Sequence, residues 1–74
     1  MTGKTAAQAP AVEKPEHAIP ELTTYELRDH RRALEQAIAF FGEHHPAAPV
    51  RAELQARLDA VIAEQDDRAR IARA

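Results

Sequence analysis

The stretch Gly42-Glu43-His44-His45-Pro46, GEHHP, decides how this chain of 74 residues folds, because apolar residues recur at helical spacing on both sides of it. Glycine takes a left-handed conformation at no steric cost, so Gly42 is predicted to end a first helix. His45 precedes a proline, which biases it away from helical angles. Pro46 and Pro49 suit the first turn of a second helix, where a missing N–H does no harm. The stretch therefore predicts a corner between two helices.

The same stretch offers Glu43, His44 and His45 as metal ligands. A zinc site needs three or four convergent ligands at about 2.0–2.2 Å from the ion. The other candidates, Glu26 and His30, lie about 18–20 Å away along the predicted first helix. We therefore expect no metal site, and the sequence suggests no cofactor.

The first helix is predicted over about residues 23–42, and its start is the most specific local signal. With Thr23 as the N-cap, its hydroxyl can accept from the N–H of Glu26, and the Glu26 carboxylate can accept from the N–H of Thr23, which is a capping box. Leu22 and Leu27 then stand at the two positions of a hydrophobic staple. This signal predicts structure and says nothing about function.

The second helix is predicted over about residues 47–72, and a short link makes it antiparallel to the first. The fold class is thus all-α, a two-helix hairpin over residues 21–74. We expect Leu27 near Gln65 or Ala69, and the bulkiest contacts beside the corner. The predicted hairpin core or dimer interface consists of Leu27, Leu34, Ile38, Phe41, Val50, Leu54, Leu58, Val61 and Ile62.

Residues 1–20 are predicted to be a disordered N-terminal tail. They contain three prolines, few large apolar side chains and no helical period. A second interpretation is a segment that folds onto a partner through Ile19 and Leu22. The tail has only two lysines and no arginine, so it is not a basic arm for nucleic acid.

The apolar content of 45% is largely alanine, so two helices alone offer a thin core. We therefore expect the hairpin to dimerise into a four-helix bundle, and a different partner protein is the rival possibility. The absence of cysteine, of a secretory signal and of a long apolar run favours a cytoplasmic protein with no membrane segment.

The function expected from this pattern is a small non-enzymatic helical protein–protein interaction module, acting as a homodimer in an adaptor, regulator or accessory role. Tyr25, Phe40 and Ile71 lie off the main apolar stripes and form the candidate partner surface. The chain has no serine, no cysteine and no glycine-rich loop, so neither an enzyme nor a small-molecule substrate is indicated.

The alternative function is a nucleic-acid-associated regulator that uses arginines at the open end of the hairpin. Antiparallel packing would bring two basic groups together there. Acidic residues are interleaved with the same arginines, no aromatic residue lies among them for stacking on bases, and the net charge is −2, which all weigh against it. The candidate contacts are Arg28, Arg31, Arg32, Arg68, Arg70 and Arg73.

Overall fold

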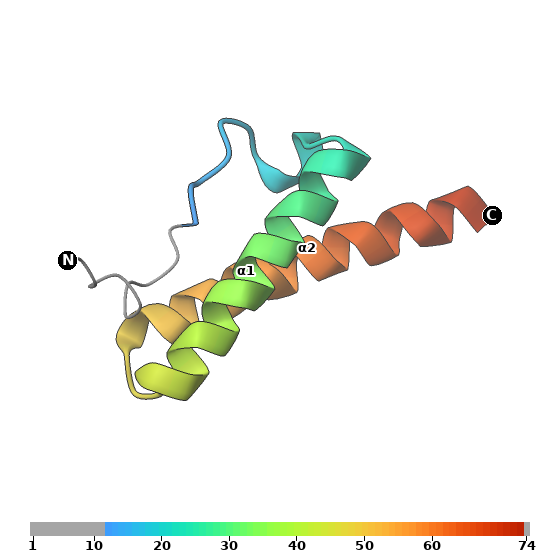
Figure 1. Cartoon of the computed structure of the whole chain (residues 1–74). Coiled ribbons are helices and arrows are strands. Elements are labelled where there is room, and N and C mark those ends of the chain that lie inside the picture. The colour runs from blue at the N-terminus through green and yellow to red at the C-terminus, as the bar shows by residue number, and fades with distance from the viewer. Residues whose placement is uncertain (1–11, 74) are drawn as a thin grey trace.

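A computed structural model describes residues 12–73 and places two long helices side by side. A short 3-10 helix, η2 (Ile19–Glu21), comes first and is followed by α1 (Thr24–His44) and α2 (Pro49–Arg73). The chain reverses between the two long helices, so α1 and α2 run antiparallel (Figure 1). Over the described residues the structure contains no strand. The prediction of an all-α helical hairpin is confirmed.

The start of α1 is the capping box predicted from the sequence. The backbone N–H of Glu26 donates to Oγ1 of Thr23 over 3.1 Å, and the N–H of Thr23 donates to Oε1 of Glu26 over 2.8 Å. The residues expected to form the staple, Leu22 and Leu27, are both buried in the same apolar cluster. Two of the otherwise unpaired groups at the helix start are thereby satisfied.

The corner between the helices lies later than predicted. α1 continues for two residues past Gly42, and the N–H of His45 still donates to the carbonyl four residues before it, over 2.8 Å. Gly42 is helical, so the prediction that it ends α1 in a left-handed conformation is wrong. The helix stops at His45, with φ of −146° and ψ of 63°, because Pro46 excludes helical angles from the residue before it. α2 then begins with Pro49, in the position that tolerates proline best.

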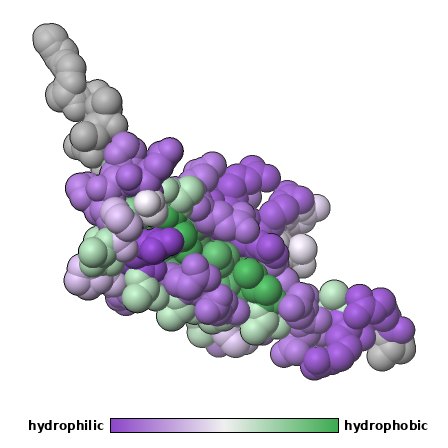
Figure 2. Space-filling model, turned by 90° about the horizontal axis from the view of Figure 1, so that it is seen from below, coloured by the Kyte–Doolittle hydropathy of each residue, from purple (hydrophilic) through white to green (hydrophobic). Residues whose placement is uncertain are grey.

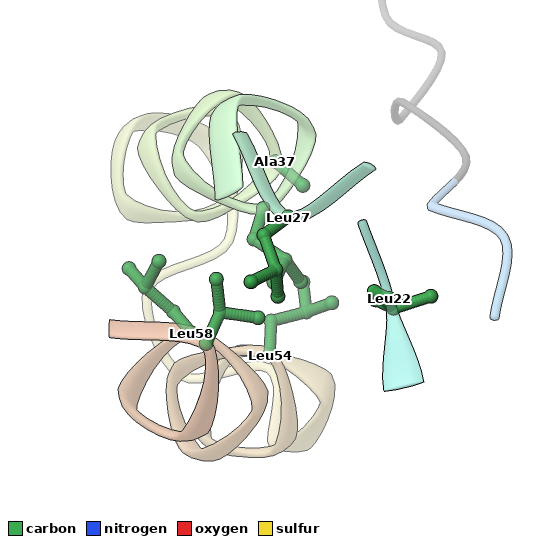
Figure 3. Packing of buried hydrophobic residues seen from close by; sticks show 7 residues of the cluster. Leu22, Leu27, Ala37, Leu54 and Leu58 are labelled. Carbon is green, nitrogen blue, oxygen red and sulfur yellow. The ribbon is translucent and has the colours of Figure 1, made fainter. Parts of the chain in front are cut away.

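The core lies between the facing sides of the two helices. Figure 3 shows Leu27 of α1 directed toward Leu54 and Leu58 of α2. Of the predicted core positions, Val50 is 37% exposed. The fully buried cluster consists of Leu22, Leu27, Leu34, Ala37, Leu54, Leu58 and Val61, and Val12, Ile19, Ile38, Phe41 and Ile62 pack partly buried against it.

Contacts at both ends fix the register of the helices. Leu27 lines a common hollow with Gln65 and Ala69, as predicted. Near the corner, Gly42 faces Arg51, whose Nη2 would lie 3.6 Å from a Cβ added at the glycine. Antiparallel pairing therefore runs from Gly42 opposite Arg51 to Leu27 opposite Gln65.

The N-terminal segment (residues 12–22) completes part of the core. Leu22 is only 4% exposed and comes from beside the two helices (Figure 3), and Val12 and Ile19 also pack against the cluster. Beside the corner Val50 is exposed, so the apolar packing is not confined to that end of the hairpin. The predicted disordered tail falls partly on residues 1–11, which lie outside the described residues.

Candidate interaction surface

The N-terminal segment covers one long side of the hairpin. Residues 14–19 share a hollow with His30 of α1 and Arg57 of α2. Farther along, Nη2 of Arg68 donates to the backbone carbonyl of Pro20 over 3.1 Å. These contacts define a covered side, which borders the apolar core on one flank.

The opposite flank of the core is the open side. Ile38 lies eight residues after His30, a rotation of about 80° around α1, and Ile62 lies five residues after Arg57, a rotation of about 140° around α2. Around each helix, a buried leucine points in a direction between that of the covered-side residue (His30 or Arg57) and that of the isoleucine. The leucine faces the core, so the isoleucine lies on the flank opposite the covered side. Both isoleucines are only partly buried. Figure 2 shows apolar side chains reaching the surface as a band between polar rows on one face of the molecule.

Charges of opposite sign border the open side. Arg28 is exposed on the α1 edge, and its guanidinium carbon lies 5.0 Å from the centre of the Tyr25 ring. Asp66 is exposed on the α2 edge, one turn after Ile62. Since Leu27 lies beside Gln65, Arg28 and Asp66 stand at about the same height along the hairpin. The α1 edge is thus basic where the α2 edge is acidic.

The predicted partner surface does not form one patch within a single chain. Tyr25 and Ile71 are 69% and 70% exposed, and both lie toward the open end. Phe40 lies fifteen residues after Tyr25, about 22 Å along α1. It is only partly exposed and belongs to the corner instead.

Aromatic and imidazole rings gather at the corner. The ring of Phe40 lies 4.6 Å from that of His44 and 5.4 Å from that of Phe41, centre to centre, the latter in an edge-to-face arrangement. The ring of His45 lies 6.2 Å from both phenylalanines. The histidines of the GEHHP stretch therefore act as packing groups around Phe40. In the described part of the chain, no three histidine or acidic side chains are grouped so that they could hold a metal ion.

The arginines predicted to contact nucleic acid are largely engaged within the chain. Arg31 donates from Nε to Glu35 over 3.1 Å and from Nη1 to Gln65 over 2.8 Å. Arg68 pairs with Glu64 over 2.8 Å, and Arg70 pairs with Asp67 over 2.7 Å. Arg28 lies over a tyrosine ring. For Arg32 and Arg73, the remaining two of the six arginines, residues 12–73 provide no hydrogen bond, ion pair or ring contact.

Two side chains have shifted pKa values. The backbone hydrogen bond from Thr23 lowers the pKa of Glu26 below its ordinary value. Partial burial, and then the nearby charge of Arg57, lower the pKa of His30. Arg57 itself places one guanidinium nitrogen, Nη2, out of solvent, and residues 12–73 give that nitrogen no hydrogen-bond partner. His30 and Arg57 thus meet beneath the N-terminal segment.

Some of these residues carried no signal in the sequence. Nothing in the sequence marks Arg57 for burial, and its Nη2 lies out of solvent where the N-terminal segment folds back over it. Ala37 is fully buried although alanine is common on exposed faces of both helices. No helical period marks residues 12–18, so only the side chains of Ile19 and Leu22 pointed to packing.

No family model, curated protein or solved structure matches this chain. Among the described residues, neither helix combines the length and the apolar character required to cross a bilayer.

Proposed function

We propose that this chain is a small non-enzymatic helical protein–protein interaction module, an adaptor, regulator or accessory subunit that acts as a homodimer. Two copies would join along their open sides into a four-helix bundle. One observation carries the proposal: the N-terminal segment covers one flank of the core, while Ile38 and Ile62 remain partly exposed on the other. Burial of such apolar surface is the main driving force for association.

The charges beside the open side favour a second copy as the occupant. In a twofold dimer with both corners at the same end, α1 of one copy lies beside α2 of the other at equal height. Arg28 of each copy then meets Asp66 of the other, so the basic and acidic edges meet twice. Such rim charges contribute more to orientation and specificity than to affinity.

Charge reversal tests this arrangement. Arg28→Glu should weaken dimerisation because it places two carboxylates opposite each other at both contacts. Asp66→Arg alone should weaken it in the same way, and the double variant should restore the dimer. Arg73→Glu is the matched control, since Arg73 lies beyond the start of the facing α1. Sedimentation velocity measures the dimer fraction of each variant; a double variant as weak as the single ones would contradict the proposed register.

The second candidate is the nucleic-acid-associated regulator. Arg32 and Arg73 are exposed, but Arg31, Arg68 and Arg70 already bind acidic side chains of the chain itself. A gel shift with duplex and single-stranded DNA at low salt separates the two functions, because phosphate contacts strengthen as salt falls. A shift that Arg32→Gln and Arg73→Gln abolish would favour nucleic acid over the dimer module.

A further inference from the structure

The hollow beneath the N-terminal segment has the composition of a binding site for an amphipathic anion. Its volume is about 430 Å³, within the roughly 300–1,000 Å³ of small-molecule sites. Three elements build it: the N-terminal segment from Lys14 to Ile19 except Glu16, the N-terminal half of α1 at His30, and the stretch of α2 from Glu53 to Ala60. It is an open groove rather than an enclosed cavity, and it exists only when the N-terminal segment lies on the hairpin.

The polar groups of this hollow are mostly cationic or hydrogen-bond donors. Lys14, His17, His30 and Arg57 line it, and of residues 12–73 Glu53 is the one acidic side chain in its lining. Nη2 of Arg57 is buried and receives no acceptor from residues 12–73. Because solvent does not reach Nη2, a ligand in the hollow would bind the other N–H groups of the guanidinium, and hydrogen bonds from a charged arginine to a carboxylate are among the strong ones.

The remaining wall of the hollow is apolar. Pro15 and Ile19 of the N-terminal segment face Ala56 and Ala60 on α2. The two alanines lie one turn apart, so their small side chains leave room between the segment and the helix. An aliphatic chain could lie along this wall with one side open to solvent, and inorganic phosphate would gain nothing from the wall.

We propose that this hollow binds a small aliphatic carboxylate, with its carboxylate on the guanidinium of Arg57 and its chain between Ile19 and Ala60. The imidazole of His30 and the ammonium of Lys14 supply further donors at the carboxylate end. Binding would hold the N-terminal segment on the hairpin, because the ligand touches both. This site lies on the covered side and does not depend on the proposed dimer.

Titration of the full-length chain with octanoate, followed by amide NMR shifts, tests the site. An aliphatic ligand of this size is expected to bind with a dissociation constant on the order of 1 mM. Saturable shifts should fall on residues 14–19 and on the turn of α2 around Arg57. Octan-1-ol, which has the chain without the charge, and inorganic phosphate, which has charge without the chain, should each bind at least about tenfold more weakly.

Two variants test separately the charge of Arg57 and the free volume of the hollow. Arg57→Gln should weaken octanoate binding at least about tenfold, while Arg51→Gln on the same helix should leave it unchanged. Ala60→Leu fills the hollow without altering its charge and should abolish octanoate binding. Ala63→Leu is its control and should leave binding unchanged. Circular dichroism checks that each variant keeps its helices. The absence of saturable shifts, or shifts centred elsewhere, would overturn the proposal. So would an affinity for octanoate in the Arg57→Gln or the Ala60→Leu variant equal to that of the unmodified chain.

Discussion

Nη1 of Arg31 on α1 donates to Oε1 of Gln65 on α2 over 2.8 Å, and among residues 12–73 this is the one side chain–side chain hydrogen bond that joins the two helices. The buried residues between the two helices are all apolar. Apolar packing tolerates small shifts along the helix axes, so a directional bond near the open end helps to fix the register. Nε of Arg31 also donates to Glu35, which holds the guanidinium in place.

We predict that Arg31→Ala and Gln65→Ala are coupled. Each change alone should lower the free energy of unfolding by about 1 kcal/mol, and the coupling in a double-mutant cycle should be about 0.5–1.5 kcal/mol. Urea unfolding at one fixed protein concentration measures both quantities. Arg32→Ala, on the same helix and exposed, is the control. Strictly additive effects would show that the hydrogen bond contributes nothing in solution.

The helical conformation of Gly42 predicts that Gly42→Ala stabilises the protein. Alanine is favoured over glycine inside a helix by about 0.5–1 kcal/mol. The added Cβ would lie 3.6 Å from Nη2 of Arg51, an ordinary contact with the end of a flexible side chain. The thermal unfolding midpoint should therefore rise. A fall would instead indicate the left-handed capping glycine that the sequence suggested.

Leu22 should contribute as much to stability as a leucine of the helices themselves. Because it is almost fully buried in the cluster, Leu22→Ala should cost about 2–5 kcal/mol. Val50→Ala, at the exposed position beside the corner, should cost far less. Chemical denaturation of the two variants gives the comparison, and equal losses would mean that the N-terminal segment does not pack on the hairpin as described.

The capping box predicts that the free energy of unfolding depends on pH through Glu26. The folded-state pKa of Glu26 lies below its ordinary value of 4.5, chiefly because the N–H of Thr23 donates to the carboxylate. A lowered folded pKa means that this stabilisation is present above the unfolded pKa and is lost as the pH falls through the folded pKa. Glu26→Gln keeps a side-chain acceptor for the N–H of Thr23 but cannot titrate.

The stability difference between the wild type and Glu26→Gln should therefore be larger at about pH 6 than at about pH 3. Urea unfolding at both pH values measures it, and NMR titration of the Glu26 carboxyl group gives the pKa directly. A difference that does not change with pH, or a carboxyl that titrates at or above 4.5, would contradict the capping geometry.

What could be predicted from the sequence follows the range of the interactions involved. The capping box depends on residues three apart, and Thr23 and Glu26 bond as expected. The predicted end of α1 is wrong because the sequence contains two signals for it. Gly42 can end a helix, whereas Pro46 excludes helical angles from the residue before it. The continued hydrogen bonding of the backbone past Gly42 favours the second signal.

The covered side could not be predicted because its contacts are distant in sequence. Residues 14–19 have no period of their own, and only the folded hairpin offers them His30 and Arg57 as neighbours. For the same reason the pattern of two apolar stripes left both flanks of the core open. The structure distinguishes them, since the segment occupies one flank and leaves Ile38 and Ile62 on the other.

The mass of the intact chain in solution shows whether two copies join along the open side. Sedimentation equilibrium over a range of micromolar concentrations should give twice the 8.2 kDa of one chain, falling toward the monomer on dilution. Ile62→Glu should shift this equilibrium toward the monomer, and Ala63→Glu should not. A helical, cooperatively unfolding species of 8.2 kDa at every concentration would contradict the account.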